Sequence, residues 1–129
     1  MCRKGRVYFR RIAVERGEQF GRALEHLVFM ELVAHSSYSE LAYDISFWRT
    51  KSGTEVDLVL GSGEVAIGVK GAPRVDDREL RSLREFNAGH RPRKAIIICN
   101  ESSERRVGEI RVTPWRPFLA KLWAGEIIG

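Results

Sequence analysis

The chain contains few cysteines and no long apolar run. Two of its 129 residues are cysteines, too few for the disulfide framework of a small secreted protein, and neither Cys2 nor Cys99 has metal-ligand spacing. No apolar run approaches the roughly 18 residues that a membrane span needs, and no signal-peptide core follows the basic start. We therefore expect a cytoplasmic protein with no membrane partner, in which Cys99 is a small core residue.

Composition favours one folded domain. Hydrophobic residues make up 43% of the chain, enough for a core at this length, so residues 1–129 are predicted to form a single domain. The 22 Lys and Arg exceed the 17 Asp and Glu by five. This modest excess, interpreted as spread along the chain, is compatible with an anionic partner such as nucleic acid but supports it only weakly.

Hydrophobic periodicity predicts a mixed α/β domain. Apolar residues three and four apart indicate a helix from Glu18 to near Ser36. The other predicted elements are strands at 43–48, 55–60, 64–70, 94–100 and 107–113, a helix from Asp76 or Asp77 to near Gly89, and a terminal helix at 115–128. Tyr8 and Phe9 suggest a short strand or turn. Because a helix separates the third and fourth strands, that pair is predicted to be parallel.

Asp57 and Lys70 place charges inside segments that otherwise resemble buried strands. A buried charge without a partner is costly, so each needs an ion pair, a metal or a function. Glu55 shares a strand face with Asp57, and Gly68 shares one with Lys70, because side chains two apart point the same way. Pairing of the two strands through the turn at 61–63 would bring Asp57 within reach of positions 66–70.

One hypothesis is that these residues form a metal-dependent hydrolytic site. A carboxylate and an ammonium on one sheet, beside a helix that carries Glu25, could hold a divalent cation and a water for phosphodiester hydrolysis. Asp57 and Glu25 would bind the metal, and Lys70 would orient the water or offset charge on the phosphate. The spacing alone favours a plainer alternative, in which Asp57 and Lys70 form a salt bridge or lie on a solvated edge and Glu25 is an ordinary helix residue.

Histidine and tryptophan add little to the search for a site. No ligand spacing relates the three histidines, for which ordinary surface or core positions are predicted: His26, His35 and His90. The three tryptophans could stack on nucleic-acid bases, but their apolar neighbours favour packing in a core or an interface: Trp48, Trp115 and Trp123.

Taken in order, these segments resemble the PD-(D/E)XK nuclease superfamily. The closest similarity is to the uncharacterised domain that forms the C-terminal part of many bacterial and archaeal AAA-type ATPases. The resemblance covers nearly the whole chain and is carried by Gly21 to Glu25 followed by Glu31-Leu32, by Trp48 to Leu60, and by Ile67-Gly68-Val69-Lys70. It implies a restriction-endonuclease-like fold, in which helices flank a mixed central β-sheet.

The resemblance also implies roles for individual residues. Glu25, Asp57 and Lys70 would be the catalytic set, with Asp57 and Glu25 as ligands of Mg²⁺. The sequence departs from the superfamily pattern at Gly68, where a Glu or Asp is expected, and this departure removes a metal ligand. Glu64 shares the face of Gly68 but lies about 13 Å along the strand, at ~3.3 Å per residue, and Glu55 could serve only a shifted metal. Mg²⁺ binding is therefore expected to be weak.

Three hypotheses about function stay open at this point. The first is a nuclease-like domain with a degenerate metal site, acting as a nucleic-acid-binding or regulatory module associated with an ATPase. The second is an active metal-dependent DNA nuclease, and the third is an interaction domain that contacts an ATPase or a second copy of itself. The chain contains no Gly-x-x-x-x-Gly-Lys-Ser/Thr phosphate loop, so we expect it to be the C-terminal part of an ATPase or a detached copy. The predicted contacts to DNA are Lys51, Arg74, Arg78 and Arg81.

Overall fold

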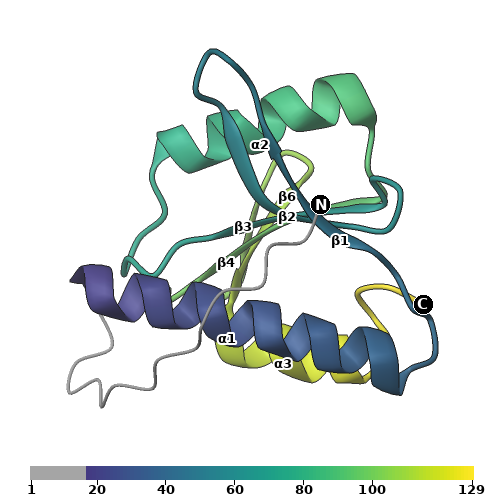
Figure 1. Cartoon of the computed structure of the whole chain (residues 1–129). Coiled ribbons are helices and arrows are strands. Elements are labelled where there is room, and N and C mark those ends of the chain that lie inside the picture. Colours follow the sequence, from purple (N-terminus) through teal and green to yellow (C-terminus); the bar gives the residue numbers. More distant parts are fainter. Residues whose placement is uncertain (1–16) are drawn as a thin grey trace.

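A computed structural model describes residues 17–129 and shows a mixed sheet with helices on both faces (Figure 1). The elements in chain order are α1 (Gly17–Tyr38), β1 (Ile45–Arg49), β2 (Glu55–Leu60), β3 (Val65–Val69), α2 (Asp77–His90), β4 (Lys94–Cys99), β5 (Arg105–Val107), β6 (Ile110–Pro114) and α3 (Trp115–Trp123). The predicted mixed α/β class is confirmed. The element predicted at Tyr8 and Phe9 lies outside the described residues.

The sheet has the strand order β1-β2-β3-β4-β6-β5. The first three strands pair antiparallel, while β3 pairs parallel with β4, and β4 pairs parallel with β6. The parallel β3–β4 pair confirms the prediction from the intervening helix. No helix between residues 17 and 129 is both long enough and apolar enough to cross a bilayer.

Two predicted boundaries were wrong for local reasons. The strand predicted at 107–113 is a hairpin of β5 and β6, because Gly108 turns the chain at a φ of 60°. The helix predicted at 115–128 ends at Trp123, and Gly125 then takes a φ of 78°. The predicted end of α2 near Gly89 is confirmed, since the helix ends at His90 and Arg91 then adopts a φ of 47°. Pro92 follows Arg91 and disfavours further helix.

Two apolar layers hold the helices against the sheet. On one face α1 buries residues four apart, namely Phe20, Leu24, Val28 and Leu32, and α3 packs in the same layer. On the other face α2 buries Leu80, Leu83 and Phe86 against the sheet, in a layer that includes Cys99, so the prediction that Cys99 belongs to the core is confirmed. Asp76 caps α2 by accepting hydrogen bonds from the backbone N–H groups of Arg78 and Glu79.

The register between β1 and β2 contains one extra residue on β2. Ser46 pairs with Val59, but Trp48 pairs with Val56. Two steps along β1 therefore match three along β2, and the extra residue falls at Asp57 or the position after it. Such bulges bend a strand and redirect its side chains, and they are common beside functional sites.

A close contact between two backbones brings the start of α1 to the end of β3. A Cβ atom on Gly71 would lie 2.6 Å from the Cα of Gly21 and 2.9 Å from its backbone N. No side chain fits at position 71 unless the helix moves. Glu25 lies one helical turn beyond Gly21, so this contact also sets the distance of Glu25 from the strand ends.

We predict that Gly71→Ala lowers the free energy of unfolding by about 1–3 kcal/mol or more, because the new methyl group overlaps the backbone of α1. Gly21→Ala is the matched control. Its Cβ would meet no heavy atom within 4 Å, and removal of a helical glycine stabilises by about 0.5–1 kcal/mol. Urea denaturation of both variants measures the difference. Equal stability of the two would show that the helix and the strand end are not in contact.

Candidate functional site

A cleft of about 800 Å³ opens where α1 and α2 begin, beside the start of β2 and the end of β3. All three residues of the predicted catalytic set line it: Glu25 from α1, Asp57 from β2, and Lys70 directly after β3. The fold thus brings together charged residues that lie up to 45 positions apart in the sequence. Glu79 of α2 lines the same cleft.

Asp57 is held by the backbone of β3. Its Oδ2 atom accepts a hydrogen bond of 2.7 Å from the N–H of Val69, just beyond the last paired position of β2 and β3, Leu58 with Ile67. The carboxylate therefore accepts a hydrogen bond from a strand N–H that lies beyond the last backbone pair of β2 and β3. Burial, with a smaller contribution from the charge of Glu79, raises the pKa of Asp57 to about 6 against the lowering effect of this hydrogen bond.

Glu25 approaches from α1, one turn after Gly21. The residue as a whole is exposed, yet its pKa is raised to about 7 because its carboxyl group loses solvent and faces Asp57 and Glu79. Lys70 and Arg22 oppose this rise only partly. The carboxyl groups of Glu25 and Asp57 therefore both have a pKa above that in water. The nearby positive charges do not fully offset the effects of burial and of the neighbouring carboxylates.

Lys70 pairs with Glu79, and no salt bridge with Asp57 occurs in the part of the chain that the structure describes. The Nζ of Lys70 lies 3.5 Å from Oε1 of Glu79, with the two side chains 40% and 26% exposed. Asp57 was the expected partner of Lys70. Lys70 pairs with Glu79 of α2 instead, because Gly68 and Lys70 share the strand face that α2 covers. Leu83 of α2 would lie 3.9 Å from a Cβ at position 68.

Glu79 is the site residue that the sequence did not reveal. It stands three residues after the cap Asp76, where a Glu is common simply because it stabilises the first helical turn. The criterion of a charge inside an apolar strand does not identify such a residue, because it belongs to a helix. Only the packing of α2 on β3 places Glu79 next to Lys70.

Position 68 has room for a Cβ. A Cβ on Gly68 would lie 4.0 Å from Oδ2 of Asp57 and 3.7 Å from Cγ1 of Ile97, which are ordinary contact distances. Neither of the two carboxylates considered as substitutes takes its place: Glu64 lies in the turn before β3, and Glu55 is paired with Arg49 at 3.0 Å on the surface.

The residues present do not form a metal centre by themselves. Between residues 17 and 129, no group of three or more His, Cys, Asp or Glu side chains is placed to hold a metal ion. Magnesium needs oxygen ligands in near-octahedral geometry and is usually held by one or two carboxylates together with waters and phosphates. Asp57 and Glu25 would supply at most that minimum.

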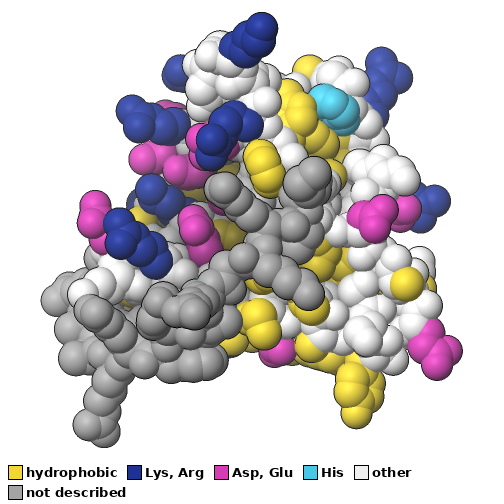
Figure 2. Space-filling model, in the orientation of Figure 1, with side chains coloured by type: hydrophobic (Ala, Val, Ile, Leu, Met, Phe, Trp, Pro, Cys, Tyr) yellow, Lys and Arg dark blue, Asp and Glu magenta, His cyan; other side chains and the backbone are white. Residues whose placement is uncertain are grey.

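Of the four basic residues predicted to contact DNA, Arg78 lines the cleft. The other three are exposed outside its lining, in the β1–β2 turn, the loop before α2 and α2 itself: Lys51, Arg74 and Arg81. On the face drawn in Figure 2, basic and acidic side chains alternate where α1 and α2 begin. This side of the cleft is mixed in charge.

The net positive charge is not spread along the chain, contrary to expectation. Six Lys and Arg and one Glu precede residue 17, so sixteen basic and sixteen acidic residues remain from there to the end. The described part of the protein therefore carries no formal net charge. Any attraction of phosphate to the cleft must come from the local placement of residues such as Arg78 and Lys70.

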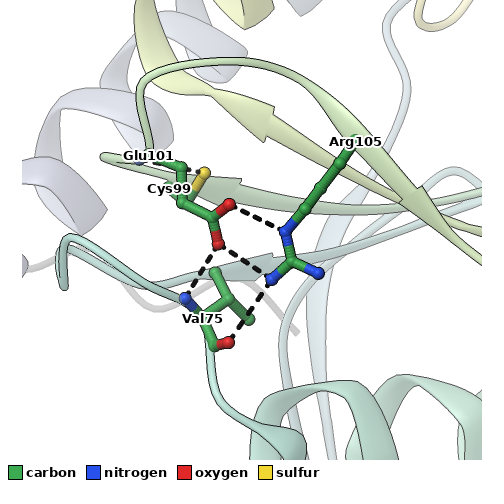
Figure 3. Close-up of polar contacts among 4 residues, drawn as sticks. All are labelled: Val75, Cys99, Glu101 and Arg105. Carbon is green, nitrogen blue, oxygen red and sulfur yellow. Dashed lines mark hydrogen bonds and ion pairs between the residues drawn. The ribbon is translucent and has the colours of Figure 1, made fainter.

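A second polar cluster fixes the loop that forms one wall of the cleft. Glu101 accepts hydrogen bonds from Nε and an NH group of Arg105, at 2.8 and 2.9 Å, and from the N–H of Val75 at 2.9 Å (Figure 3). The Glu101 side chain is 8% exposed, and Arg105 lowers its pKa. This cluster ties the chain between β3 and α2 to the segment after β4, and so supports the position of both Lys70 and Glu79.

Trp48 and Trp115 pack as predicted, and the cleft is free of histidine. Trp48 contacts Phe86 and His90 edge-on, with ring centroids 5.3 and 5.6 Å apart, and the last two stack at 4.3 Å. Trp115 packs against the core layer of α1 and α3. None of the three histidines lines the cleft.

The sequence comparison assigns a family but no function. Residues 20–118 match the family described as Domain of unknown function (DUF4143), which covers most of the chain. The chain belongs to this family. No curated protein and no solved structure matches it. The family match does not establish a relationship to the PD-(D/E)XK superfamily.

We predict that Asp57→Ala destabilises the protein more than Asp57→Asn does. Alanine leaves the N–H of Val69 without its acceptor in a buried place, at a cost of about 1–3 kcal/mol, whereas the amide oxygen of asparagine can still accept that bond. Urea denaturation near pH 8 and hydrogen exchange of the Val69 amide give the comparison. If asparagine is as harmful as alanine, the hydrogen bond is not what holds Asp57.

Proposed function

We propose that this chain is a nuclease-like domain with a degenerate metal site, which serves as a nucleic-acid-binding or regulatory module beside an ATPase. One observation carries the proposal. Glu25, Asp57 and Lys70 line the same cleft, while a glycine stands at position 68, where a Cβ would lie 4.0 Å from Oδ2 of Asp57. A restriction-endonuclease-like fold is part of the proposal, supported by the helix, three strands, helix and parallel strand that surround this cleft.

The chemistry of the cleft favours binding over cleavage. Phosphodiester hydrolysis requires an activated water and stabilisation of charge on the phosphate. Glu25 has a pKa of about 7 and is partly protonated at neutral pH, and the ammonium of Lys70 is paired with Glu79. With a glycine at position 68, the cleft also lacks a further carboxylate ligand. We expect weak Mg²⁺ affinity and little or no cleavage.

An interaction domain is the second candidate, and exposed apolar side chains favour it. Leu27, Met30 and Val33 of α1 are 38%, 44% and 39% exposed, and Trp123 at the end of α3 is 44% exposed. Such a surface is typical of a contact with another protein. An ATPase domain or a second copy of the chain is the proposed partner, in the cytoplasm.

DNA binding by the intact chain tests the first candidate. Fluorescence anisotropy with a labelled duplex should show binding that weakens steeply between about 50 and about 200 mM salt, because neutralised phosphates release counterions. Replacing both Arg78 and Arg81 by Gln should reduce the slope of log affinity against log salt by about 1–2. Arg106→Gln is the control, since it removes an exposed charge from β5 at the far edge of the sheet.

Three other results would contradict the proposed function. Absence of binding at about 50 mM salt would favour the interaction domain. A slope that falls equally in the Arg106→Gln control would show that the cleft is not the binding surface. Plasmid cleavage with Mg²⁺ that Asp57→Asn abolishes would identify an active nuclease.

A further inference from the structure

The ion pair of Lys70 and Glu79 lies inside the cleft, where the proposed function would place a phosphate group. Both residues line the cleft, with 3.5 Å between the charged atoms. Partly exposed pairs of this kind are weak, so a ligand can separate them. The pair is therefore an arrangement that a bound anion can change.

Glu79 affects the whole cleft and not only Lys70. Its negative charge raises the pKa of both Asp57 and Glu25. It also stands in the first turn of α2, where the helix dipole favours an anion, although the N–H groups of Arg78 and Glu79 are already bonded to Asp76. The carboxylate of Glu79 therefore holds the place next to Lys70 that would otherwise suit a phosphate oxygen.

We propose that Glu79 controls access to the cleft by competing with phosphate groups for Lys70. This inference rests on the proposed function and adds a regulating residue to that site. While Glu79 holds Lys70, that ammonium is occupied, and the carboxyl groups of Glu25 and Asp57 in the same cleft disfavour a further anion. When Glu79 is removed or displaced, Lys70 becomes available to a phosphate and the local negative charge falls.

The test is a titration of the intact chain with inorganic phosphate near pH 8, where phosphate is largely dianionic. The NMR signal of the Lys70 Cε–Hε group, assigned with Lys70→Gln, reports binding at the site. Glu79→Gln removes the competing charge and keeps the side-chain size. Asp77→Asn is the matched control, because it removes one exposed negative charge from the same helical turn outside the cleft lining.

We expect Glu79→Gln to reach half-saturation at a phosphate concentration at least about threefold lower than the wild type, while Asp77→Asn resembles the wild type. An equal effect of both variants would show a general charge effect and overturn the inference, as would no effect of Glu79→Gln. Duplex DNA binding by the same proteins tests the proposed function separately. A gain for phosphate without DNA binding by any variant would keep the role of Glu79 and refute nucleic-acid binding.

Discussion

The contact between the backbones of Gly21 and Gly71 determines where the cleft can form. It holds the first turns of α1 against the chain that leaves β3, and both Glu25 and Lys70 depend on that arrangement. A larger residue at position 71 would separate the helix from the strand ends. The Glu101–Arg105 cluster fixes the same connection from its other end, through Val75. The charged residues of the site thus depend on a backbone contact at one end of this connection and on a partly buried ion pair at the other.

Electrostatics in the cleft oppose stability. Asp57 is partly buried and Glu25 faces it, so each has a raised pKa, and the one ammonium beside them is paired with Glu79. Groups arranged only for stability would be paired or solvated. Carboxyl groups with raised pKa values in a cleft identify a candidate functional site.

The sequence predicted the order of the main elements, because hydrophobic period and strand alternation are local signals. It predicted the convergence of Glu25, Asp57 and Lys70 only through same-face spacing taken together with the family resemblance. It did not predict the extra residue of β2 at Asp57, since a bulge changes register without changing composition. Nor did it identify Glu79, whose position after a helix cap is common in any helix. Hairpins as short as β5 and β6 depend on one glycine, Gly108, and look like a single strand.

The central claim is that the cleft lacks one carboxylate at position 68. Calorimetric titration of folded Gly68→Glu with Mg²⁺ tests it most directly, with Gly68→Gln as a control that has the same size but no charge. A Cβ at position 68 would make only ordinary contacts with Asp57, Ile97 and Leu83, and the metal would offset the cost of burying the carboxylate there. We predict that Gly68→Glu binds Mg²⁺ at least about tenfold more tightly than either the wild type or Gly68→Gln. A folded Gly68→Glu protein that binds no more tightly than Gly68→Gln would contradict the claim.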